Sequence, residues 1–212
     1  MKGQCSAADA LARLRDGNRR FVSNQSTAAS TPNHSRRAEL LAGQEPFAII
    51  LGCSDSRVPA ELVFDQGFGD LFVIRIAGNI VAPSQIGSVE FAASRFGARL
   101  VIVLGHSQCG AVTATLEEMM GKTTTRSPNL LSIVDCIRPS LEPLLSGRTV
   151  DGLDAVMHDA VRANVRASVS HLRNGSELLE SLARDDGLIV VGADYSLETG
   201  VVTFLDGGPE PG

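Results

Sequence analysis

Five short apolar runs stand out along the chain, each bounded by polar residues or glycine. They are Phe47–Gly52, Leu71–Ile76, Leu100–Gly105, Leu188–Gly192 and Val201–Leu205. The first four are nearly continuous in Ile, Leu, Val and Phe, which is typical of central parallel strands covered on both faces. The last two are joined by a short segment containing a glycine. This connection predicts a hairpin and therefore an antiparallel strand at one edge of the sheet.

Helical periodicity fills the gaps between these runs. Near the start, Leu11, Leu14 and Phe21 recur at helical spacing among arginines. Residues 154–172 carry one apolar stripe, and Ser176 has the position of an N-cap for a following helix over Glu177–Asp185. The residues after Ala111 also favour a helix. Strands alternating with helices predict an α/β fold with a mostly parallel central sheet, an antiparallel edge strand and flanking helices.

The length of 212 residues suits one domain. We expect residues 1–35 to form a helical arm and a loop, 36–206 an α/β core and 207–212 a tail. A net charge of −5 argues against nucleic acid as a partner. No apolar run reaches the ~18 residues of a membrane span. Four cysteines are too few for a disulfide scaffold, so we expect a protein of the reducing cytoplasm.

Cysteine and histidine side chains follow two of the predicted strands. Cys53 comes directly after the first run, and His106 and Cys109 come after the third. If these strands are parallel neighbours, their carboxyl ends bring two thiolates and an imidazole to one point. That donor set suits Zn²⁺, but a redox cysteine pair and ordinary core cysteines are the alternatives that spacing leaves open.

With only three good protein ligands, the pattern is typical of a catalytic zinc site, which keeps one position for water. Asp55 is the nearby candidate for a fourth ligand. Arg57, two residues further on, is placed to hold it off the metal through a bidentate pair.

The segments Cys53–Arg57 and Gly105–Gly110 together resemble the paired motifs of the β-class carbonic anhydrases. The resemblance extends over most of the chain, from about Asp9 to Leu205. Further similar segments are Gly43-Gln44, Phe72-Val73-Ile74-Arg75, Ala77-Gly78-Asn79 and Gly87-Ser88-Val89-Glu90.

The resemblance implies specific roles for these positions. Cys53, His106 and Cys109 would bind one Zn²⁺ per subunit, and Asp55 and Arg57 would form the catalytic dyad, with Asp55 as fourth ligand only in a closed state. The substrate pocket would include the residues Gln44, Phe72 and Phe91.

The family fold also implies a homodimer or homotetramer in which the N-terminal helix packs on a partner subunit; an ordinary surface helix is the alternative. Two positions depart from the family: Phe91 stands where a tyrosine is common, and Ile50 where some bacterial members carry a tryptophan used in bicarbonate regulation.

The expected activity is the reversible hydration of CO₂ to bicarbonate and a proton. Zinc-bound hydroxide would attack the carbon, oriented by Asp55, while Arg57 keeps Asp55 in place and ionised. Hydrolysis of COS or CS₂ at the same site is a rival hypothesis, because these substrates also present a linear electrophilic carbon. A non-catalytic zinc or bicarbonate-binding protein is a second rival.

Overall fold

The computed structural model describes residues 5–27, 34–123, 127–146 and 154–205. Five strands form one sheet in the order β2-β1-β3-β4-β5. Strands β1 to β4 are parallel to one another, and β5 pairs antiparallel with β4. Their bounds are β1 (Ala48–Gly52), β2 (Leu71–Arg75), β3 (Leu100–His106), β4 (Ile189–Tyr195) and β5 (Val202–Phe204). The predicted sheet, including its antiparallel edge strand, is confirmed.

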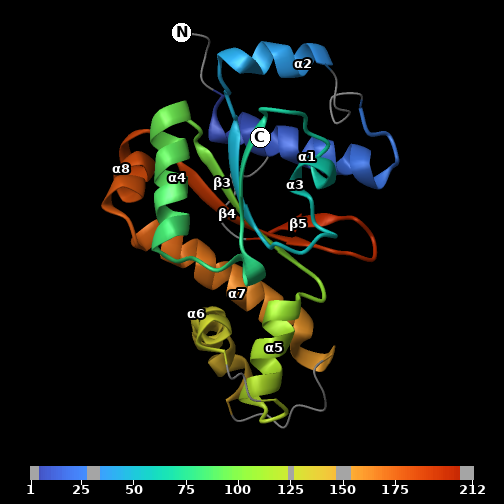
Figure 1. Cartoon of the computed structure of the whole chain (residues 1–212), viewed down its shortest axis with the longest axis vertical. Helices are drawn as coiled ribbons and strands as arrows, with labels where there is room; N and C mark the ends of the chain where they lie inside the picture. The colour runs from blue at the N-terminus through green and yellow to red at the C-terminus, as the bar shows by residue number, and fades with distance from the viewer. Residues whose placement is uncertain (1–4, 28–33, 124–126, 147–153, 206–212) are drawn as a thin grey trace.

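Helices lie between and around these strands (Figure 1). Their bounds are α1 (Ala7–Val22), α2 (His34–Glu39), α3 (Ala60–Val63), α4 (Pro83–Phe96), α5 (Gly110–Met119), α6 (Pro128–Leu145), α7 (Asp154–Asn174) and α8 (Glu177–Asp185), with short 3-10 turns at Leu40–Ala42 and Ala77–Asn79. The sequence pattern missed α4, because its buried face consists only of Val89, Ala92 and Ala93, a narrow stripe of small side chains.

The two faces of the sheet are covered by different helices. Alternate strand residues such as Ile50 and Ile102 pack with α1, whereas their neighbours Ile49 and Val101 pack with α4, α7 and α8. In Figure 1, α4 and α8 lie on the opposite side of the sheet from α1 and α3. Burial on both faces explains why the central strands are continuously apolar.

The N-terminal helix packs on its own chain. Leu11 and Leu14 of α1 are buried in the cluster formed with the sheet. A Cβ added at Gly17 would lie 1.8 Å from the carbonyl oxygen of Phe64, so the helix backbone touches the backbone beside α3. Asn18 donates hydrogen bonds to the carbonyls of Val63 and Gly200. Packing of this arm on a partner subunit stays a prediction.

A third apolar cluster lies beyond the carboxyl ends of the central strands, where α5 and α6 lie below the sheet in the view of Figure 1. It contains Cys53 and Cys109 together with Ile137 of α6 and Val161 of α7. No helix in the described segments is long and apolar enough to cross a membrane. The predicted tail, 207–212, lies outside the described residues. The division of the chain into arm, core and tail stays a prediction.

Candidate metal centre

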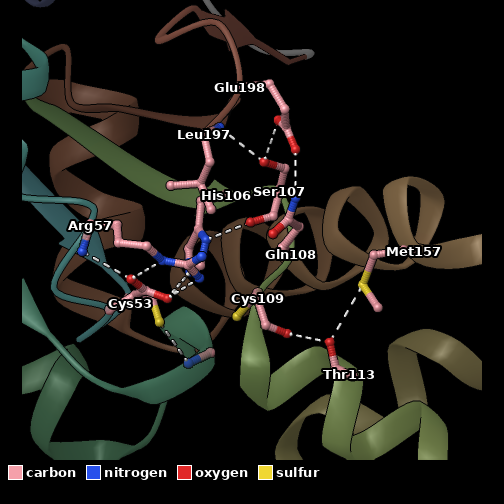
Figure 2. A network of polar contacts seen from close by, with 12 residues as sticks. Cys53, Arg57, His106, Ser107, Gln108, Cys109, Thr113, Met157, Leu197 and Glu198 are labelled. Atoms are coloured by element: carbon pink, nitrogen blue, oxygen red, sulfur yellow. Dashed lines mark hydrogen bonds and ion pairs between the residues drawn. The ribbon is translucent and has the colours of Figure 1, made fainter. Parts of the chain in front are cut away.

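The carboxyl ends of β1 and β3 place three metal-ligating side chains together. The two strands are parallel neighbours, with Gly52 opposite Leu104. Cys53 follows β1, His106 ends β3, and Cys109 stands directly before α5. Their ligand atoms lie within 4.8 Å of one another, and all three side chains are buried (Figure 2). The two thiols and the imidazole therefore lie together, as expected if the first and third predicted strands are parallel neighbours.

The His106 ring is oriented by its own loop. Its Nδ1 lies 2.8 Å from the carbonyl oxygen of Ser107, which can only accept, so Nδ1 carries the proton and donates it. The other nitrogen, Nε2, then has a free lone pair. It is fully buried and has no hydrogen-bond partner in the structure. A buried acceptor without a partner is costly, and a metal ion among the three ligands would satisfy it.

The two thiols compete for a single proton. A hydrogen bond from the Cys109 thiol lowers the pKa of Cys53, and the same interaction raises the pKa of Cys109. The Gly78 amide also donates to the Cys53 sulfur at 3.4 Å, and Asn164 of α7 restrains the same residue by donating to the Gly78 carbonyl at 2.8 Å. Two buried thiolates repel each other, and a divalent cation between them removes the repulsion.

A carboxylate and a guanidinium lie at the rim of this cluster. Asp55 accepts from Nε and Nη2 of Arg57 at 2.9 and 2.7 Å, and from the Arg57 backbone amide at 2.9 Å. These hydrogen bonds hold the pKa of Asp55 well below its usual range. The Asp55 Oδ2 atom lies 3.9 Å from His106 Nε2. An ionised acceptor therefore faces the place where the three ligand atoms converge.

Arg75, at the end of β2, fixes the loop that carries these groups. It donates to the carbonyl of Cys53 at 3.0 Å and to that of Asp55 at 2.5 Å. No role for Arg75 was predicted from the sequence. Its position could have indicated one. Arg75 is the last residue of β2 and pairs with Gly52, one residue before Cys53.

The residues predicted for the substrate pocket lie elsewhere in the single chain. Phe72 pairs with Ile49, four residues before Cys53, or about 13 Å along the strand. Its ring is 6.2 Å from that of Phe91, which is 54% exposed. Gln44 lines a cavity of about 570 Å³ with Arg36, Glu39 and Phe96. The chain does not bring these residues to Asp55, and their substrate role stays a prediction.

Comparisons with known proteins agree on one family. A family model described as carbonic anhydrase matches residues 48–202. Carbonic anhydrase 2 of Mycobacterium tuberculosis is 37% identical over 198 residues, covering 91% of this chain and 90% of that protein. The carbonic anhydrase of Mycolicibacterium smegmatis is 39% identical over 190 residues, covering 89% and 88%.

Solved structures of the same kind share the fold. The β-carbonic anhydrase CcaA has a TM-score of 0.74 at 26% identity, with 95% of this chain and 92% of that chain covered. The Coccomyxa β-carbonic anhydrase, solved with acetazolamide, has a TM-score of 0.69 at 27% identity, covering 92% and 86%. The similarity thus extends from the motifs to nearly the whole chain.

Proposed function

Because this chain belongs to the β-carbonic anhydrase family, we propose that it catalyses the reversible hydration of CO₂ to bicarbonate and a proton with Zn²⁺ bound by Cys53, His106 and Cys109. β-Carbonic anhydrases use zinc. The observation that carries the assignment is the buried cluster of three ligand atoms with an unpartnered His106 Nε2. Two thiolates and one imidazole are a donor set that zinc prefers.

Three protein ligands leave one coordination position for water. Zinc held here by Cys53, His106 and Cys109 would supply Lewis acidity, which would lower the pKa of such a water and so provide hydroxide, the nucleophile for CO₂, near neutral pH. The chain's contribution is to hold the metal beside an apolar cluster that includes Ile80 and Ile137, and to orient the attacking water.

Asp55 performs that orientation in this proposal. Its Oδ2 faces the cluster and would accept a hydrogen bond from the attacking hydroxide, which would leave a lone pair of the hydroxide free for CO₂. Because its pKa is held so low by Arg57, Asp55 stays ionised and acts as an acceptor, not as a base that removes the proton. Binding of Asp55 to the metal as a fourth ligand in a closed state requires that Arg57 first release it.

A second copy of the chain would complete the substrate pocket. Strand β2 is an edge of the sheet, and Phe72 on that strand contacts Phe91 and Phe96. A homodimer or homotetramer formed over this edge would bring Phe72, Phe91 and Gln44 of one copy toward the metal site of another. All four cysteines are free thiols, in keeping with a reducing cytoplasm.

The test uses protein purified without chelators, with zinc measured by mass spectrometry and CO₂ hydration by stopped-flow with a pH indicator. We expect about one zinc per chain and hydration of CO₂ faster than hydrolysis of COS or CS₂. Cys136→Ser, which changes an exposed cysteine of α6, should match the unmodified protein. A chain that binds no zinc, or that hydrolyses COS or CS₂ but does not hydrate CO₂, would refute the proposal.

A further inference from the structure

The turn between β4 and β5 contacts the loop between two of the zinc ligands. Ser107 and Gln108 separate His106 from Cys109, and residues 196–200 form the turn. The Leu197 amide donates to the Ser107 hydroxyl at 2.9 Å, and the Ser107 amide donates to the Tyr195 carbonyl at 2.9 Å. Figure 2 shows this turn beside the loop, with Glu198 at the outer end of the network.

The Glu198 carboxylate collects three hydrogen bonds from side chains. Its Oε2 accepts from the Ser107 hydroxyl at 2.9 Å and from the Ser196 hydroxyl at 3.0 Å, and its Oε1 accepts from the Gln108 amide at 2.8 Å. Its own backbone amide and these hydroxyls lower the pKa of Glu198, so it is ionised at neutral pH. One carboxylate therefore binds both residues of the loop.

We propose that Glu198 is a positioning residue for the metal: it locks the Ser107-Gln108 loop and so fixes the direction in which His106 Nε2 points and the place of the Cys109 sulfur. The inference rests on the proposed zinc site. It adds a residue about 90 positions away in the sequence, in the turn that joins the two antiparallel strands β4 and β5, that none of the motifs contains.

The backbone of the loop needs such a restraint. Gln108 has a φ of 56°, in the left-handed region. The other non-glycine residues with positive φ in the described segments are Asn24, Asp65 and Asn79, which are residue types that tolerate this conformation. Glutamine lacks their short side chain. It is held here by the bond from its amide to Glu198.

The same loop orients the imidazole ring of His106. The carbonyl that accepts from His106 Nδ1 belongs to Ser107, and the Ser107 hydroxyl is held between Glu198 and the Leu197 amide. If Ser107 shifts, the acceptor that orients the ring shifts with it. Partners of this kind behind a metal-binding histidine are worth about 10- to 100-fold in metal affinity. Because Glu198 is itself exposed, we expect the lower end of that range.

The experiment measures zinc release and cobalt spectra in four proteins: unmodified, Glu198→Ala, Glu198→Gln and Thr199→Ala. Glu198→Ala removes both carboxylate oxygens and with them all three hydrogen bonds. Glu198→Gln keeps one oxygen and places an amide hydrogen against a donor, so its effect should be intermediate. Thr199→Ala is the matched control, because the Thr199 hydroxyl accepts from the Val201 amide within the same turn and makes no hydrogen bond to Ser107 or Gln108 in the described segments.

Zinc release is followed with a chromogenic chelator in excess, and the Co²⁺-substituted proteins are compared by visible absorption. We expect zinc to leave Glu198→Ala about tenfold faster than the unmodified protein, with altered cobalt bands, and to leave Thr199→Ala at the unmodified rate. Glu198→Gln should fall between them.

Equal release rates and unchanged cobalt spectra in Glu198→Ala would overturn the inference while leaving the zinc site intact. Faster release in Thr199→Ala equal to that of Glu198→Ala would also overturn it, because the effect would then come from the turn as a whole. An unmodified protein that binds neither zinc nor cobalt would instead refute the proposed function, and this inference with it.

Discussion

The two carboxylate oxygens of Asp55 are both occupied by the guanidinium of Arg57, at 2.9 Å to Nε and 2.7 Å to Nη2. Oδ2 is at the same time 3.9 Å from His106 Nε2. Asp55 is thus hydrogen-bonded to Arg57 on one side, and on the other side it faces the three candidate metal ligands. Among the described residues, the side-chain hydrogen bonds that orient the Asp55 carboxylate come from Arg57, two residues away.

Arg57→Ala should keep zinc and lose most activity. Arg57 binds Asp55 and no proposed ligand atom, so the metal stays, but freed Asp55 no longer orients the water and can move onto the metal. We expect CO₂ hydration to fall by about 100-fold. Arg184→Ala is the control, because it removes a comparable exposed pair with Asp185 away from the site. Zinc content and hydration rate are measured on one preparation; an active Arg57→Ala would remove the dyad from the mechanism.

Cys109→Ser should lose zinc and activity together. Serine replaces a thiolate with a hydroxyl that ionises poorly, and a site with three protein ligands has no substitute. Zinc content of the purified variant, compared with that of Cys136→Ser, is the measurement. Full zinc occupancy with normal turnover in Cys109→Ser would contradict its assignment as a ligand.

Hydration of CO₂ should rise with pH above neutrality. Two thiolate ligands leave more negative charge at the metal than three imidazoles do, so the pKa of a water there should exceed the value near 7 of a three-histidine site by about one unit. Asp55 stays ionised throughout this range, because its pKa is far below it. A hydration rate that is constant from about pH 6.5 to 9, with zinc content unchanged, would show that this charge argument is wrong.

Asp65 should make the fold sensitive to acid. Its side chain is fully buried, and its Oδ2 pairs with Arg20 Nε at 2.5 Å while its Oδ1 accepts from the Thr27 amide at 2.9 Å. Burial opposes ionisation, but the bonds from Arg20 and Thr27 outweigh it, so the pKa of Asp65 is lowered. A lowered pKa in the folded state means that this stabilisation is present above about pH 4 and is lost as the pH falls further.

We therefore expect Asp65→Asn to reduce the free energy of unfolding at pH 7 by about 2 kcal/mol. The difference from the unmodified protein should shrink as the pH falls below about 4, because the unfolded chain then takes up the proton before the folded Asp65, whose pKa is lowered, does. Asp185→Asn, at an exposed pair, should change stability little. Urea unfolding of the variants and of the unmodified protein, at pH 7 and at lower pH, gives these free energies. If the difference in unfolding free energy between Asp65→Asn and the unmodified protein is the same at every pH, Asp65 does not titrate as described.

Local pattern was sufficient for the strands and for the position of the candidate ligands, while the assignment of zinc rather than a redox pair or core cysteines needed the family resemblance. β1 and β3 are apolar up to the glycine at or near their carboxyl ends because both faces are buried, so the sequence marks each strand to within about one residue. Cys53, His106 and Cys109 stand at those ends and are chemically distinctive, so their convergence follows once the strands are neighbours. The narrow stripe of small residues in α4 gave no comparable signal.

Tertiary structure alone decided which distant residues support the site. The order of the strands brings Arg75 to the Cys53 loop, and the β4–β5 turn brings Glu198 to Ser107, although 91 positions separate them. Hydrophobic periodicity reports whether a residue faces a core, because burial of each side chain follows the local repeat of the backbone. A hydrogen bond between polar residues far apart in the chain leaves no such repeat, since it exists only after the sheet has set the two segments side by side.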